Sequence, residues 1–218
     1  MQSGRWDETL EDADRFIAEC ETSPHNMETS ARQTRAHVRF ARGDAEGAFE
    51  DWEHGLALAR AMGSPERLIP ALLDLGHAFA LLGRLDEARA YILEGMNVAR
   101  ANPALAALLG RIAGESDRLG VTSEVDEIIS QAPEGPWKDV GLAELHGEGT
   151  RAADMFRRMG ATAIEADVRI AAAEALLEEG RTAEGLAELE KALTFYRSVG
   201  ATFFLDRGEA LLAEAKTA

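Results

Sequence analysis

The sequence predicts an all-α protein, a solenoid of about 12 helices arranged as hairpins. Glycines followed by a short acidic segment recur along the chain, and the first three stand 39 and 40 residues apart. Twenty residues after each glycine stands a second helix breaker. A spacing of this kind is typical of helical repeat arrays, in which each unit is a helix, a tight turn and a second helix. The two sets of breakers are Gly4, Gly43, Gly83 and Gly180, and Pro24, Gly63, Pro103 and Gly200.

Each helix is expected where apolar residues recur every three or four positions between two breakers. In the best-formed unit Leu68, Leu72 and Leu75 keep this spacing before Gly83, and Ile92 continues it afterwards. The first helix reads as the second half of a hairpin, and the last one stands alone. In order, the expected helices are 4–20, 27–42 with 45–62, 65–82 with 85–101, 103–119 with 122–131, 137–146 with 150–159, 163–179 with 182–199, and finally 202–215.

One unit resembles a tetratricopeptide repeat. The similarity rests on Leu75-Gly76, Phe79, Gly83, Leu85, Ala88, Ile92 and Gly95, which match that family's pattern of small, aromatic and turn positions. Pro103 comes three residues later than the family's usual proline, so the chain is similar to the longer-period arrays. The resemblance implies a tetratricopeptide-like α-α superhelix, a right-handed solenoid, spanning 1–218.

The last third resembles the carboxyl-terminal helical arrays of large bacterial signalling ATPases. The segments that carry this resemblance are 151–162, 171–180 and 192–202. It implies a C-terminal fragment of a larger protein, placed after a nucleotide-binding module and combined with a nucleotide cyclase domain or a helix-turn-helix domain. The matching residues are structural, so they imply a fold and a context, and no catalytic site.

The array is interrupted at 133–136, where Pro133 and Pro136 flank a Glu-Gly pair. Proline removes a backbone donor and clashes inside a helix, so a turn is expected here. We expect the solenoid to bend at this point or to divide into sub-blocks 1–132 and 137–218.

Charge and composition favour a cytoplasmic protein that contacts neither nucleic acid nor membrane. The net charge is −16, with 39 acidic against 23 basic residues, so the surface repels phosphate groups. No apolar run is long enough to span a bilayer, and the first residues lack a signal-peptide pattern. The single cysteine, Cys20, falls on the packed face of its helix and is expected to be a buried structural thiol.

The motifs of common enzymes are absent. The chain has no phosphate-binding Gly-rich loop before Lys-Ser or Lys-Thr, no His-Glu-x-x-His, no paired-cysteine spacing and no Gly-x-Ser-x-Gly elbow. None of the five histidines stands three or four residues from another, so a helical metal pair is not expected. We therefore expect a non-enzyme without cofactor or metal.

The concave side of the array is the expected binding surface. His37 and His77 each precede a turn glycine by six residues, a place that faces the groove in tetratricopeptide arrays. These side chains could equally be the exposed side of the inner helices without a ligand. The same offsets mark nine groove candidates: Gln33, His37, Phe40, His77, Leu81, Asp117, Arg118, Glu174 and Glu178.

The tryptophans and the chain ends lead to further expectations. Trp52 occupies a core position, whereas Trp6 and Trp137 could be exposed anchors. The first helix lacks a partner before it, so an apolar face near Trp6, Leu10 and Phe16 could be left open. The last helix, with Phe203 at its start, is expected to cap the array.

The leading hypothesis is a scaffold for protein–protein interaction in a bacterial signalling or transcription-regulatory ATPase. Its partner would be a protein, a peptide or another domain of its own chain. A second hypothesis is a homodimer formed through the open first helix. A third is a small-ligand or enzymatic pocket at the central break, for which Trp137, Lys138, Asp139 and His146 are the candidates.

Overall fold

The computed structural model describes residues 5–215, and within this range every regular element is helical. The order of the elements is the predicted one. The bounds are α1 Trp6–Thr22, α2 Glu28–Ala41, α3 Ala45–Met62, α4 Pro65–Leu81, α5 Leu85–Ala101, η1 Pro103–Glu115, α6 Thr122–Ser130, α7 Pro136–Leu145, α8 Gly149–Arg158, α9 Thr162–Glu178, α10 Thr182–Val199 and α11 Thr202–Ala215. The all-α fold class and the number of helices are confirmed.

The turn glycines end the first helix of each hairpin as expected. Gly43 has φ +88°, in the left-handed region that favours glycine, and the backbone N–H of Asp44 donates to the carbonyl oxygen of Arg39 at 2.9 Å. The same bond joins Arg84 to Phe79 after Gly83. This geometry turns the chain within two residues, so the second helix packs against the first.

One expected α-helix has a different form. The segment expected as a helix over 103–119 is a 3₁₀ helix, η1, from Pro103 to Glu115. Gly110 and Gly114 lower the α-helical propensity of this segment. Gly110 also lies against α7, where an added Cβ would stand 3.2 Å from the Cα of Gly141. The two backbones therefore approach closely at this crossing.

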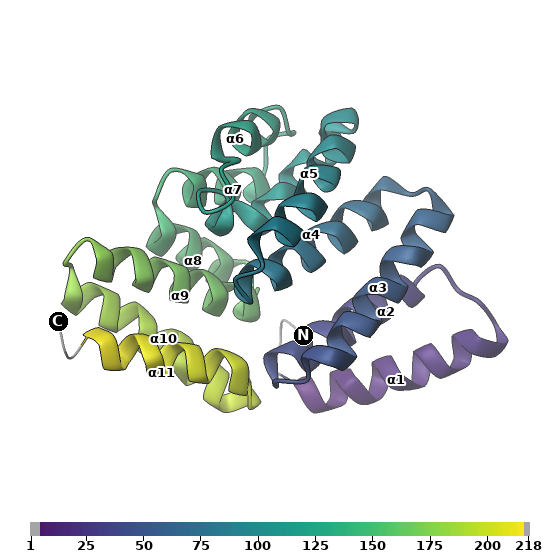
Figure 1. Cartoon of the computed structure of the whole chain (residues 1–218), viewed down its shortest axis with the longest axis horizontal. Coiled ribbons are helices and arrows are strands. Elements are labelled where there is room, and N and C mark those ends of the chain that lie inside the picture. The colour runs from purple at the N-terminus through teal and green to yellow at the C-terminus, as the bar shows by residue number, and fades with distance from the viewer. Residues whose placement is uncertain (1–4, 216–218) are drawn as a thin grey trace.

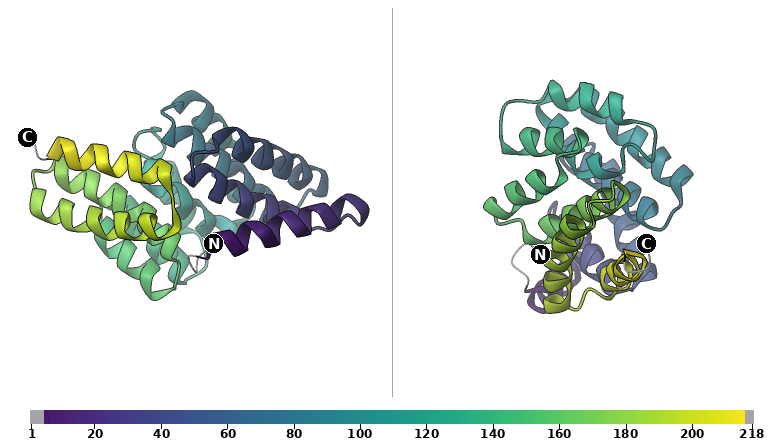
Figure 2. Two further views of the ribbon diagram at one scale, coloured as in Figure 1. Left: turned by 90° about the horizontal axis from the view of Figure 1, so that it is seen from below. Right: turned by 90° about the vertical axis from the view of Figure 1, so that its left-hand side faces the viewer.

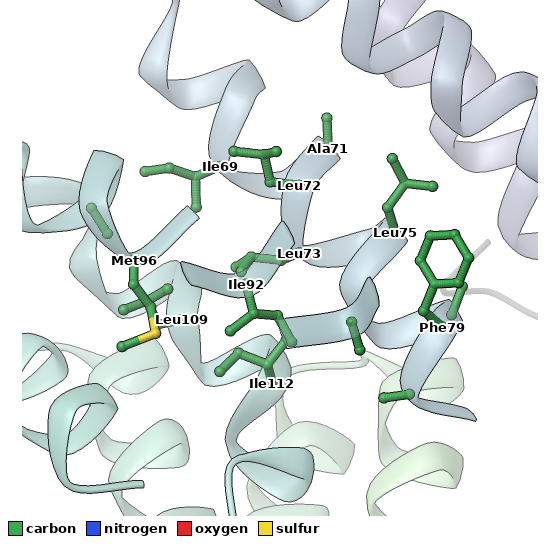
Figure 3. Close-up of a cluster of buried hydrophobic side chains, with 14 of the residues drawn as sticks. Ile69, Ala71, Leu72, Leu73, Leu75, Phe79, Ile92, Met96, Leu109 and Ile112 are labelled. Carbon is green, nitrogen blue, oxygen red and sulfur yellow. The ribbon is translucent and has the colours of Figure 1, made fainter. Parts of the chain in front are cut away.

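The core lies between the two helices of each hairpin and between successive hairpins. Leu73, Ile92, Met96 and Ile112 are fully buried between α4, α5 and η1 (Figure 3). Trp52, 2% exposed, and Cys20, 4% exposed, are both buried, as expected.

The array curls back on itself, so that its last helices meet its first (Figures 1 and 2). The rings of Phe40 on α2 and Phe203 on α11 lie 4.6 Å apart, and the guanidinium of Arg42 donates to the carbonyl oxygen of Val199 at 3.2 Å. Arg42 Nη2 also stands 2.7 Å from a carboxylate oxygen of Asp7. We call this contact between α1–α2 and α10–α11 the seam.

The seam overturns the expectation of an open apolar face on the first helix. Trp6 is only 4% exposed, and its ring packs edge-on against Phe195 at 6.0 Å. Leu10 is partly buried in the same cluster, and Phe16 packs against His25. Part of this face of α1 is thus covered by α10, far along the chain. The homodimer stays a prediction, but the surface it relied on is covered within the chain.

The last helix is likewise more than a terminal cap. Phe203 contacts α2 across the seam, and Phe204 stacks on Tyr196 of α10 at 4.8 Å. Trp137 is 45% exposed at the start of α7 and is the one tryptophan that lies at the surface.

Candidate functional site: the central cavity

A cavity of about 610 Å³ lies at the centre of the curled array. Its wall is built by the first helix of every hairpin, together with α11. The contributing elements are α2, α4, η1, α7, α9 and α11, and the second helices stand outside them. Since the seam brings α11 against α2, the concave groove of the predicted solenoid is here a central cavity.

Four of the nine predicted groove residues line this cavity, namely Gln33, His37, His77 and Leu81. The other five lie elsewhere. Phe40 is buried in the seam, and Glu174 pairs with Arg207 of the cavity wall at 2.6 Å. Asp117, Arg118 and Glu178 are exposed at helix ends, outside the cavity. Whether any of the nine binds a ligand stays a prediction.

Four of the five misplaced candidates lie near a helix end. Phe40, Asp117, Arg118 and Glu178 stand two or three residues before their turn glycine, and of the candidates at this offset only Leu81 faces the cavity. Most of the inward face runs back along the helix, at six, nine or ten, and thirteen residues before that glycine, which is the helical period. This period was the available signal for six of the wall residues that were missed: Thr34, Asp74 and Arg111 at nine residues, and Ser30, Pro70 and Asp167 at thirteen. Glu115 and Glu144 were also missed, and this period does not indicate them.

Asp74 is the most buried charge on the wall, with 3% of its side chain exposed. Arg111 of η1 forms an ion pair with it, and the Nε2 atom of His37 lies 3.4 Å from its Oδ1 atom. Burial alone would raise the pKa of Asp74, but the charges of Arg111 and His37 outweigh burial and hold that pKa below its ordinary value. Asp74 is therefore an ionised carboxylate that joins α2, α4 and η1.

A second pair on the cavity wall joins α4 to η1. The Nδ1 atom of His77 lies 2.8 Å from the Oε1 atom of Glu115. Burial works to lower the pKa of His77, but the carboxylate of Glu115 has the greater combined effect and raises it. The pKa of Glu115 is lowered in turn, because the imidazolium opposes the effect of burial. The pair is best described as an imidazolium facing a carboxylate.

Two further carboxylates on the wall, those of Asp167 and Glu144, form no ion pair among the described residues. Asp167 of α9 accepts a hydrogen bond from the hydroxyl of Tyr196. Glu144 of α7 makes no hydrogen bond or ion pair within residues 5–215, and its Oε2 atom would lie 3.7 Å from a Cβ added at Gly114.

Burial raises the pKa of both carboxylates. For Glu144 the negative charges of Glu115 and Asp167 add to burial, and its pKa lies well above the ordinary value. For Asp167 the charge of His77 and the hydrogen bond from Tyr196 offset burial only in part. Three carboxylates from η1, α7 and α9 thus approach one another closely enough to interact.

A second cavity of about 590 Å³ adjoins the first and shares Gly114, Glu144, Val168 and Ala171 with it. The candidates predicted at the central break line neither cavity. Lys138 pairs with Glu134 at 2.8 Å, and the ring of His146 lies 3.0 Å from Asp126, both away from Glu144. The part of the chain that the structure describes contains no group of three His, Cys, Asp or Glu side chains arranged to hold a metal ion.

No helix within 5–215 is both long enough and apolar enough to cross a membrane. No family model matches the chain, and no curated protein matches it. Among 34 similar chains of solved structures is one from the crystal structure of BtubC (BKLC) from P. vanneervenii. It has 15% sequence identity and a TM-score of 0.48, and the match covers 98% of this chain and 90% of that chain.

Proposed function

We propose that this chain is a non-enzymatic binding module whose recognition site is the central cavity. The observation that carries the proposal is the convergence of six helical elements on one cavity of about 610 Å³. Ligand sites in proteins commonly enclose about 300–1,000 Å³, with a few polar groups set among apolar ones. Here the polar groups are His37, Asp74, His77 and Glu115, and the apolar ones include Leu81 and Phe204.

The seam favours a compact ligand over a long extended peptide. In an open solenoid an extended segment can lie along the whole groove, but here α11 contacts α2 and the groove curves back into a cavity. A small molecule, or the end or a single side chain of a protein partner, is the occupant of suitable size. Another domain of the same protein could offer such a side chain.

The biological context that we propose rests on the sequence resemblance. A tetratricopeptide-like array in a bacterial signal-transduction or transcription-regulatory ATPase would act in the cytoplasm as a sensing or regulatory region. Binding in the cavity would stabilise the closed seam, and the other domains of the protein would respond to this change. Fold alone does not define such a role, so the cavity itself has to be tested.

The test uses a variant in which the cavity is filled. Ala171 lines the cavity on α9, and Ala171→Phe places a ring inside it; Ala187→Phe adds the same ring at an exposed site on α10. Thermal unfolding of the purified chains is followed across a set of bacterial metabolites and short peptides, after circular dichroism has confirmed that each variant is folded. We expect a ligand that raises Tm for the wild type and for Ala187→Phe but not for Ala171→Phe. A ligand that stabilises all three chains equally would contradict the cavity as the site.

A further inference from the structure

We infer that the central cavity binds an organic cation, a protonated amine or a guanidinium group on an apolar stem, through the carboxylates of Glu144 and Asp167. This inference rests on the proposed function and names the chemical class of its ligand.

The first step is the pairing of charges on the cavity wall. Each arginine there already faces a carboxylate, Arg111 that of Asp74 and Arg207 that of Glu174, and His77 faces Glu115. An anionic ligand would have to displace one of these partners. Glu144 and Asp167 form no ion pair within the described residues, and the cations that act on Asp167, His77 and His37, already face Glu115 and Asp74. The charge that the cavity lacks is therefore positive.

The second step is the cost of these carboxylates in the cavity, where both residues are half-buried. An ionised group held inside a protein without a partner is unfavourable, and it responds by taking up a proton. The raised pKa values of Glu144 and Asp167 are the sign of this response. Within residues 5–215 Glu144 makes no hydrogen bond or ion pair, so it joins no two helices in this way. A cation between the two carboxylates would favour the ionised form of both.

The third step concerns the rest of the wall. Leu81, Ile164 and Phe204 give the cavity an apolar side that suits a hydrocarbon stem. Gln33 lines the cavity, and its amide nitrogen is buried without a hydrogen-bond partner. If the Gln33 side chain turned toward the ligand, this nitrogen could donate to a neutral acceptor on the ligand, such as an amide carbonyl. A free diamine and a lysine or arginine side chain of a protein partner share this chemistry.

The experiment is calorimetric titration of the full chain at neutral pH with matched probes. Hexylamine and agmatine carry the cation, whereas hexan-1-ol and hexanoate carry a neutral and an anionic group on a similar stem. We expect one site per chain for the cations and at least tenfold weaker binding of the other two. An acetylated Gly-Lys-Gly amide presents the ammonium on a peptide; tighter binding of this probe than of hexylamine assigns the ligand to a protein partner, and the reverse assigns it to a small molecule.

The variants separate this inference from the proposed function. Glu144→Gln keeps the size of the side chain and removes its charge, and Glu127→Gln makes the same change at an exposed site on α6. We expect at least a tenfold loss of cation affinity in the first and none in the second. Asp167→Asn, which keeps an acceptor for Tyr196, is a second variant with the same expected loss.

Three results would overturn the inference. Cations could fail to bind, could bind no better than hexan-1-ol, or could bind Glu144→Gln and Asp167→Asn as well as they bind the wild type. If a neutral or anionic ligand is then found whose binding Ala171→Phe abolishes, the proposed function stands without its cationic ligand. If the cations bind Ala171→Phe as tightly as the wild type, the cavity is not their site and the cavity-based function loses this support as well.

Discussion

The same substitution, glycine to alanine inside a helix, is expected to have opposite effects at Gly76 and at Gly55. Both glycines are buried within regular helices, α4 and α3. In an unobstructed helix the change gains about 0.5–1 kcal/mol, because alanine loses less backbone freedom on folding. The surroundings decide whether this gain is realised.

At Gly76 an added Cβ would stand 2.6 Å from Cγ1 of Ile92 and 3.2 Å from the backbone carbonyl of Ala88. Ile92 is fully buried and β-branched, so its side chain has little freedom to rotate away. Overpacking of this kind costs about 1–3 kcal/mol, and the rigid neighbours favour the upper part of that range. After the gain in helix propensity is subtracted, Gly76→Ala is expected to lower the free energy of unfolding by about 1–2 kcal/mol.

At Gly55 the nearest atoms to an added Cβ are 3.8–4.0 Å away, which is ordinary contact. Gly55→Ala is therefore expected to raise the free energy of unfolding by about 0.5–1 kcal/mol. Urea unfolding followed by far-ultraviolet circular dichroism measures both values. The reasoning would be refuted if Gly76→Ala proved as stable as the wild type, or if Gly55→Ala lost more than about 1 kcal/mol.

Three further predictions concern the core and its charges. Trp52→Ala removes a side chain that is 2% exposed and should cost about 3–5 kcal/mol in urea unfolding; a loss below about 1 kcal/mol would show that the site is not packed. Arg169→Ala removes a buried guanidinium that pairs with Asp154, Glu165 and Glu188, leaves the buried Glu188 only the exposed Lys191, and should cost about 3–5 kcal/mol; a neutral result would contradict a structural ion-pair network. Because folding raises the pKa of Glu144 above its ordinary 4.5, the unfolded chain loses this proton first, and stability falls as the pH rises from that value through the folded pKa. Urea midpoints across this pH range should fall less steeply for Glu144→Gln, and an unchanged slope would contradict the raised pKa.

The sequence predicted the helical elements well, because their boundaries depend on local chemistry. A turn glycine such as Gly43 needs the left-handed conformation, and this requirement is visible in the chain without any tertiary information. The inward face of each helix was also predicted in part. Gln33, His37, His77 and Leu81 line the cavity because the helical period places them on one side. Asp74, Arg111 and Asp167 were missed because the offsets were not followed back along their helices.

What only the tertiary structure decided is where distant segments meet. The contact of Trp6 with Phe195 depends on small angles added at every hairpin, and no local pattern records their sum. Glu144 and Asp167 belong to successive hairpins, and how these hairpins stack decides that both face the same cavity. Local residue chemistry therefore determined the helices and their turns, whereas the stacking and the accumulated curvature of the hairpins determined the seam, the cavity and the two carboxylates in it that form no ion pair.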